Sequence, residues 1–197
     1  MLKSKLPIIF AVAVFLNVAF GVYLFFRNLQ PPKTAFETIS QEHLATPLTD
    51  SHGKSFSFSQ LKGQVWVIDF IFTTCGSICP VMTKNLSGVF NIYRDYSNLH
   101  FVSVSVNPDF DTPEVLTKYA QKNKIDTSRW HFLTGPREVI QDLAVGAFKI
   151  GSVEEPIFHS PSFVLVDKNG TIRGYYEGTN ALSVQSLIND LAVLLRS

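Results

Sequence analysis

The chain has little cysteine, only two residues in 197, and it shows no internal repeat and no low-complexity tract. A framework of several disulfides is therefore excluded, and one domain of this length can bury a sufficient core without one. The sequence also lacks a second cysteine pair or a histidine pair at matching spacing, which disfavours a structural zinc site with four protein ligands. After the first 30 residues the chain carries 14 basic and 16 acidic residues, a balance that argues against a nucleic-acid partner.

Charge is absent from residues 7–26, a run of apolar character that would reach about 30 Å as a helix. Lys3 and Lys5 precede this run, so the positive-inside rule favours an amino end in the cytoplasm. A signal peptide cleaved near residues 19–21 is the alternative, but the apolar run continues beyond that point. We expect an uncleaved single-pass anchor.

The domain organisation follows from this anchor and from the polar, proline-containing segment behind it. We expect a cytoplasmic amino terminus at residues 1–6, a transmembrane anchor at 7–26, a linker at 27–45 and one folded domain at 46–197. In a bacterium the anchor would lie in the inner membrane, and the folded domain would face the periplasm.

Both cysteines, Cys75 and Cys79, follow directly after the apolar run at residues 65–72. A strand that leads through a short loop into a helix, with Pro80 at the first helical position, would place both sulfurs near a helix N-terminus. The helix dipole favours thiolate there. The spacing places the sulfurs about one helical turn apart on one face, so they could chelate one ion or form one disulfide. Two inert core cysteines, the alternative, would have no reason to cluster at such a turn.

The remaining elements alternate in a recognisable order. Strands are predicted at residues 65–72, 99–106, 131–134, 162–167 and 171–176, and helices at 80–96, from 111 onward, at 135–146 and around 187–195. Asn169-Gly170 predicts a hairpin turn between the last two strands. A parallel half, an antiparallel hairpin and a final helix are typical of an α/β, thioredoxin-like fold. The fold carries an inserted helix and an N-terminal hairpin extension within residues 48–60.

A third candidate ligand is His159, which precedes the strand at residues 162–167. In a thioredoxin-like sheet, the loop entering that strand packs near the first helix, so the imidazole could reach both sulfurs. Two thiolates and one imidazole suit Cu(I), and they suit Cu(II) if an oxygen ligand is added. His100 and His131 begin strands and are expected to be structural. His43 and His52 lie before the core.

Four motifs occur in an order that resembles one known family. They are Phe72-Thr73-Thr74-Cys75-Gly76-Ser77-Ile78-Cys79-Pro80, then Ser103 to Pro108 with Asp111-Thr112-Pro113-Glu114, then Trp130 to Gly135, and His159-Ser160. The chain resembles the Sco/SenC family from about residue 48 to the C-terminus, and the N-terminal anchor fits that family too. Gly76-Ser77, Asn107 and Phe158 depart from its common pattern, which affects copper affinity and redox potential rather than the ligands.

The resemblance implies a membrane-tethered, largely monomeric protein that binds copper through Cys75, Cys79 and His159. Its implied role is that of a metallochaperone in assembly of the binuclear copper centre of cytochrome c oxidase. A periplasmic protein would donate the copper, and oxidase subunit II or a similar protein would accept it.

Thiol chemistry is the second hypothesis for the cysteine pair. In this reading the protein is a thiol-disulfide oxidoreductase that reduces the acceptor's cysteines, or a redox sensor, with Cys75 attacking and Cys79 resolving. A peroxidase of the peroxiredoxin kind is the third, but Thr74-Cys75 lacks the expected spacing.

Overall fold

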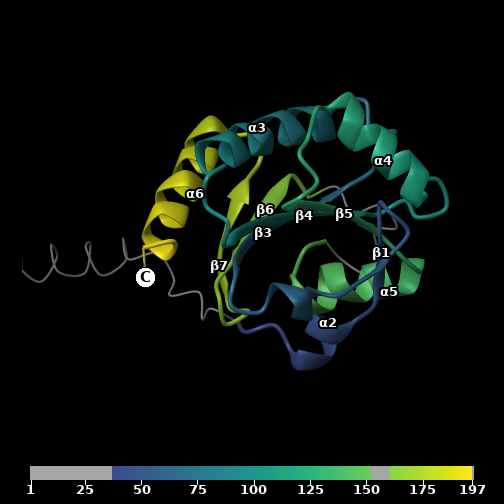
Figure 1. The fold of residues 1–197 in the computed structure, drawn as a ribbon, viewed down its shortest axis with the longest axis horizontal. Helices are drawn as coiled ribbons and strands as arrows, with labels where there is room; N and C mark the ends of the chain where they lie inside the picture. Colours follow the sequence, from purple (N-terminus) through teal and green to yellow (C-terminus); the bar gives the residue numbers. More distant parts are fainter. Residues whose placement is uncertain (1–36, 152–159, 197) are drawn as a thin grey trace, which may run out of the picture. The chain divides into compact units, whose positions relative to one another are not determined.

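Seven strands form one mixed sheet in the computed structural model, which describes residues 37–151 and 160–196 (Figure 1). The strands are β1 (Leu48–Asp50), β2 (Ser55–Phe56), β3 (Val65–Ile71), β4 (Leu99–Ser105), β5 (Trp130–Thr134), β6 (Ser162–Val166) and β7 (Ile172–Glu177). Their order across the sheet is β2-β1-β5-β4-β3-β6-β7. Strands β3, β4 and β5 are parallel to one another, and the other neighbouring pairs are antiparallel.

The centre of the sheet is the parallel pair of β3 and β4. All seven residues of β3 are buried, as its apolar and β-branched sequence predicts for a strand covered on both faces. The two strands run in register from Val65 beside Leu99 to Ile71 beside Ser105. Because both carboxyl ends lie at one edge of the sheet, the loops that follow Ile71 and Ser105 are neighbours.

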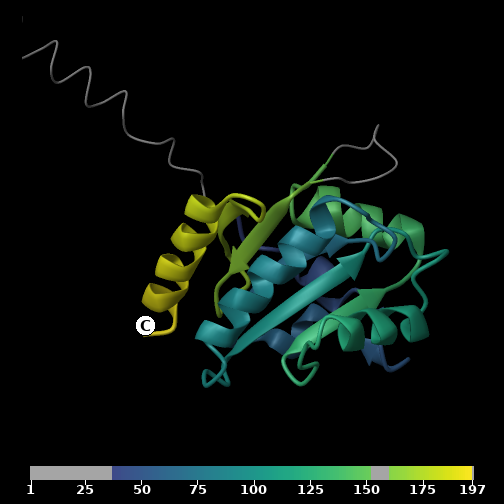
Figure 2. The ribbon, with the colours of Figure 1, turned by 90° about the horizontal axis from the view of Figure 1, so that it is seen from above.

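Helices cover both faces of the sheet (Figures 1 and 2). They are α2 (Gln41–Ala45), the 3₁₀ turn η1 (Phe58–Leu61), α3 (Ile78–Ile92), α4 (Pro113–Lys122), α5 (Arg137–Gln141), the π-helical segment η2 (Asp142–Ala147) and α6 (Ala181–Leu194). Helices α3, α4 and α6 lie on one face, and α2 and α5 lie on the other. Tyr93 is the C-cap residue of α3, and its hydroxyl donates to the carbonyl of Ile188 in α6 at 2.6 Å, which ties these two helices together.

This architecture confirms the thioredoxin-like fold with its inserted helix and N-terminal hairpin. Strands β6 and β7 form the hairpin expected around Asn169-Gly170, and Gly170 has the positive φ of 77° that such a turn requires. The extension is the hairpin of β1 and β2, and β1 continues the sheet by pairing with β5.

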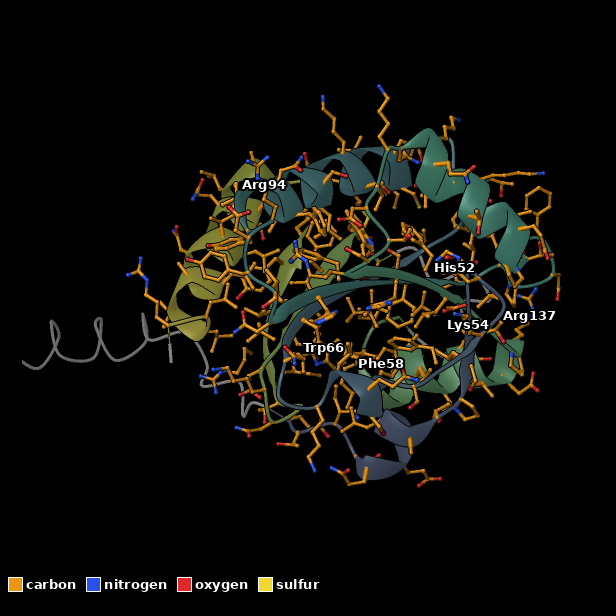
Figure 3. All side chains as sticks on the ribbon, viewed as in Figure 1. His52, Lys54, Phe58, Trp66, Arg94 and Arg137 are labelled. Carbon is orange, nitrogen blue, oxygen red and sulfur yellow. The ribbon has the colours of Figure 1, made fainter. Side chains whose placement is uncertain are left out.

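The two faces of the sheet bury different side chains. Beneath α2 and α5, an aromatic cluster is built around Phe58 and Trp66, whose rings stack 5.2 Å apart (Figure 3). Phe148 packs edge-on against both rings. Beneath α3, α4 and α6, apolar residues such as Met82 and Leu86 share the core with the two cysteines.

Several helix boundaries differ from expectation. Helix α3 begins at Ile78, which makes Pro80 its third residue rather than its first, and it ends at Ile92 rather than near residue 96. The helix predicted to run through Gly146 is α-helical only to Gln141 and then widens into η2. Apolar periodicity does not distinguish the two windings here, because η2 has only 6 residues, little more than one turn of helix.

Packing begins before residue 46, the expected start of the folded domain. Ile39 is buried in the aromatic core, Thr38 bridges to Thr171, and α2 follows. None of the α2 residues is buried, which explains the absence of a sequence pattern. Within the part of the chain that the structure describes, no helix is long and apolar enough to cross a membrane. The expected anchor at residues 7–26 lies outside that part.

Candidate metal centre

Cys75 lies in a tight turn between β3 and α3. Its backbone N–H donates to the Phe72 carbonyl at 3.1 Å, which closes the turn, and α3 starts only at Ile78. Cys75 precedes the helix, so the expected helical turn between the two cysteines is not formed, although both sulfurs lie near the helix N-terminus as predicted. Their proximity is confirmed, since the N–H of Cys79 donates to the Cys75 sulfur at 3.5 Å.

The Cys75 sulfur takes the place of a helix cap. Ser77 is the N-cap residue of α3, yet its side chain makes no capping hydrogen bond. The first N–H groups of a helix need acceptors, and a sulfur placed there receives both a hydrogen bond and the positive end of the helix dipole. Both cysteines are buried free thiols, so the turn delivers two sulfurs to one place.

The two thiols differ in acidity. Burial would raise the pKa of Cys75, but hydrogen bonds from the backbone of Cys79 and Ser77 outweigh it and lower the pKa to about 7. Burial raises the pKa of Cys79 to about 12, and the negative charges of Cys75 and Asp69 add to the rise. Near neutral pH the Cys75 thiol is therefore partly ionised, whereas Cys79 remains a thiol.

A buried carboxyl group under the thiols escaped the sequence analysis. Asp69 is wholly buried in β3, where its Oδ1 accepts from the Ser103 hydroxyl at 2.6 Å, and Ser103 accepts from Trp130 Nε1 at 2.9 Å. Its Oδ2 has no hydrogen-bond partner among the described residues. Burial raises the pKa of Asp69 to about 7, although the bond from Ser103 opposes this. The signal was visible as the one acid in the apolar run at residues 65–72.

A second polar pair completes the surroundings of Cys79. Thr83 lies one helical turn after Cys79, and its buried hydroxyl bonds to the Tyr119 hydroxyl of α4 at 2.8 Å. Burial raises the pKa of Tyr119 to about 12, and the charges of Asp69 and both cysteines contribute. These groups therefore lie near one another beneath α3.

The structure describes four of the five histidines, and none of them lies with the thiols. His159 lies outside the described residues, and His52 is exposed in the turn between β1 and β2. His43 bonds to Asp142 at 3.1 Å on the α2 side, while His100 and His131 bond to each other at 3.2 Å near the amino ends of β4 and β5. That end of the sheet is opposite to Cys75. Among residues 37–151 and 160–196, no group of three or more His, Cys, Asp or Glu side chains could hold a metal ion.

Comparison with known proteins decides the family. The family model described as SCO1/SenC matches residues 38–196, which is most of the chain and includes both cysteines. The chain belongs to the SCO1/SenC family.

Solved structures with the same fold include a SCO1/SenC family lipoprotein from Bacillus anthracis, 34% identical, with a TM-score of 0.69 over 84% of this chain and 98% of that one. Another is BsSco, described as a member of the Sco family of cytochrome c oxidase assembly proteins, in which a disulfide switch was identified. It is 29% identical, with a TM-score of 0.70 over 82% and 96% of the two chains. A Stutzerimonas stutzeri protein, provisionally described as copper-binding, is 29% identical over 65% of each chain.

Proposed function

We propose that this SCO1/SenC family member is a membrane-anchored copper metallochaperone. It binds copper through Cys75, Cys79 and His159 and delivers it for assembly of the binuclear copper centre of cytochrome c oxidase. The observation that carries the proposal is the contact between Cys75 and Cys79, which holds two soft donors at the start of α3. Thiolates are soft ligands that suit Cu(I), and a set of two thiolates and one imidazole lacks the fourth protein ligand of a structural zinc site.

The relatives support this choice of cargo and acceptor. One is described as copper-binding, and another as belonging to a family of oxidase assembly proteins. We infer that oxidase subunit II or a similar protein accepts the copper and that a periplasmic protein donates it. The lipoprotein relative is consistent with attachment to a membrane, for which residues 7–26 are the proposed anchor in this chain.

His159 is proposed as the third ligand because of where β6 begins. Strand β6 is antiparallel to β3, so Ser162 lies toward the sheet edge at which β3 ends and the Cys75 turn begins. His159 precedes that strand by three residues. The four described histidines form no such set with the thiols, so His159 is the imidazole best placed to supplement them.

The acidity difference indicates how copper would be taken up and released. Cys75 is partly ionised near neutral pH and can bind first, whereas the Cys79 thiol must exchange its proton for the metal before its sulfur can bind as a thiolate. Uptake therefore releases a proton, and affinity should rise with pH. Release to an acceptor would proceed by exchange of one thiolate at a time, with Cys79 regaining its proton.

Titration of the reduced full chain with Cu(I) tests the proposal. We expect about one equivalent to bind, with affinity lowered at least about 10-fold by His159→Ala, in the range seen for the loss of supporting groups at metal sites. The matched control is His52→Ala, which removes an exposed histidine in the turn between β1 and β2. If Cys75→Ser binds copper as tightly as the wild type, the assignment is lost.

A second function is favoured by the unequal thiols. A partner's disulfide could be attacked by the Cys75 thiolate, which releases one partner thiolate and leaves a mixed disulfide. Cys79 then loses its proton and attacks the Cys75 sulfur, which frees the second partner thiol and oxidises the pair to a disulfide. Cys79→Ser should accumulate the mixed disulfide, detected by mass on a non-reducing gel. Absence of any trapped adduct with a reducible acceptor would exclude this function.

A further inference from the structure

Asp111 is a buried carboxylate in the loop between β4 and α4, away from the two cysteines in sequence. It is fully buried. Its Oδ2 accepts from the Thr73 backbone N–H at 3.0 Å and from the Ser105 hydroxyl at 2.5 Å, and its Oδ1 accepts from the Thr73 hydroxyl. Three donors from the ends of β3 and β4 thus converge on one side chain.

Thr73, the residue that Asp111 holds, belongs to the turn that contains Cys75. Phe72 accepts the hydrogen bond that closes the turn, and Thr73 is the next residue, fixed to Asp111 through both its backbone and its hydroxyl. Cys75 follows two residues later. The position of Thr73 therefore determines where the Cys75 sulfur lies relative to the N–H groups of α3.

The Cys75 sulfur can move only slightly before it loses its contacts at the start of α3. The N–H of Cys79 reaches the Cys75 sulfur at 3.5 Å, and the Ser77 hydroxyl lies 3.9 Å from it. Contacts of this length weaken steeply if the sulfur moves away, because hydrogen bonds depend on distance and direction. A turn that shifted by a fraction of an ångström would lose the donors that favour thiolate at Cys75.

A purely structural role at the start of α4 does not account for the carboxylate. Thr112 already caps that helix, since its side chain accepts from the N–H of Val115 at 3.4 Å. Asp111 contributes its own backbone N–H to the loop, which donates to the Asn107 carbonyl at 2.9 Å. The carboxylate oxygens are engaged with the Cys75 turn and with Ser105, the last residue of β4.

We propose that Asp111 is the positioning residue of the thiol site: through Thr73 it holds the turn that places the Cys75 sulfur against the N-terminus of α3. The inference deepens the proposed function, because it names the group outside the cysteine motif that sets the reactivity of Cys75. It does not require copper, since the geometry concerns the protein alone.

The test is the rate of Cys75 alkylation by iodoacetamide in the metal-free, reduced full chain at one fixed pH, assigned to Cys75 by mass spectrometry. Asp111→Ala should slow the reaction about fourfold, because the displaced sulfur loses the N–H donors at the start of α3. Asp111→Asn should restore most of the wild-type rate. Its amide oxygen can accept from the Thr73 N–H and Ser105, while its NH₂ group donates to the Thr73 hydroxyl.

Thr73→Val provides a milder variant that keeps the backbone contact and removes only the hydroxyl. It should give a rate intermediate between those of wild type and Asp111→Ala. The matched control is Thr117→Val, which removes a part-buried hydrogen bond of helix α4, the 2.6 Å bond from its hydroxyl to the Ser51 carbonyl. It should lower stability without changing the rate of Cys75 alkylation.

If Thr73→Val leaves the alkylation rate unchanged and Asp111→Ala, where folded, does so too, Asp111 does not position the turn. If Thr117→Val slows alkylation as much as Asp111→Ala, general loosening explains the effect and the inference is overturned. If Asp111→Ala slows alkylation as expected but the wild type binds no copper, the positioning role stands and only the metallochaperone function fails.

Discussion

The two faces of the sheet show how this fold separates stability from chemistry. The face under α2 and α5 buries stacked and edge-on aromatic rings, with Phe58, Trp66 and Phe148 at its centre. The face under α3, α4 and α6 also has an apolar core, but that core contains Asp69 and the two cysteines. Burial of such polar groups costs free energy that an apolar replacement would not. The difference indicates that the α3 face is shaped by function and the α2 face by packing.

The largest expected effect is on the aromatic face. Trp66→Ala should lower the free energy of unfolding by about 3–5 kcal/mol, because it removes a large buried ring and leaves a cavity between Phe58 and Phe148. Urea unfolding measures this loss. Leu182→Ala, at an exposed leucine, is the control and should change little. If the folded Trp66→Ala protein also shows an altered rate of Cys75 alkylation, the two faces are coupled, and stability and thiol chemistry are not separated between them.

On the α3 face, the buried carboxyl group of Asp69 is expected to destabilise the fold above neutral pH. Burial raises the pKa of Asp69 in the folded protein from its ordinary value of 3.8 to about 7, so the unfolded chain loses this proton first as pH rises. Stability from this group therefore falls between about pH 4 and pH 7. Asp69→Asn should gain up to about 4 kcal/mol over wild type at pH 8 and none near pH 4.

Urea unfolding at both pH values checks this, with the exposed Asp95→Asn as control. A variant that is less stable than wild type at pH 8 would show that the charged carboxylate is well accommodated.

His131 lies at the edge of the aromatic face, between Phe56 and His100. Its contribution to stability has the opposite pH dependence to that of Asp69. Burial lowers the pKa of His131 to about 4, and the charge of His100 adds to this. The unfolded state takes up a proton first as pH falls below about 6.5, so stability is lost toward pH 4. His131→Gln should therefore be relatively more stable at pH 5 than at pH 7, by about 2 kcal/mol compared with wild type.

His52→Gln, at an exposed histidine, should show no such change between the two pH values. An equal response of both variants would mean that burial of His131 does not govern its protonation.

The smallest effect concerns the Thr83–Tyr119 pair. Tyr119→Phe removes one hydrogen bond of 2.8 Å and leaves the buried Thr83 hydroxyl without that partner, which should cost about 1 kcal/mol. Tyr93→Phe removes a comparable bond at the far end of α3 and serves as the matched comparison. The two variants should have similar thermal stability. A much larger loss for Tyr119→Phe would indicate that the polar groups beneath Cys79 act as one network.

Sequence reasoning recovered the fold because the elements carry strong local patterns. Residues 65–72 are a continuous apolar run, and Asn169-Gly170 is an unambiguous hairpin turn, so β3 and the hairpin of β6 and β7 were predictable. The cysteine pair was predictable from its place after β3. The contacts of Asp111 and Asp69 were not, because Thr73 is 38 positions from Asp111 and Ser103 is 34 from Asp69. Only the register of β3 with β4 brings them together.

The helical turn expected between the two cysteines is absent for a related reason. Cysteine spacing alone predicts one helical turn from the first sulfur to the second, whereas the closed turn at Phe72 and the residues Gly76-Ser77 keep Cys75 outside α3, which begins at Ile78. The Cys75 sulfur nevertheless meets the N–H of Cys79, so the two cysteines lie close together as expected.

X-ray absorption at the copper edge of the copper-loaded full chain identifies the atoms bound to copper. We expect sulfur scatterers from Cys75 and Cys79 together with an imidazole nitrogen that disappears in His159→Ala and persists in His52→Ala. Spectra that are identical for wild type and His159→Ala, or a sulfur shell that survives replacement of both cysteines by serine, would contradict this ligand set.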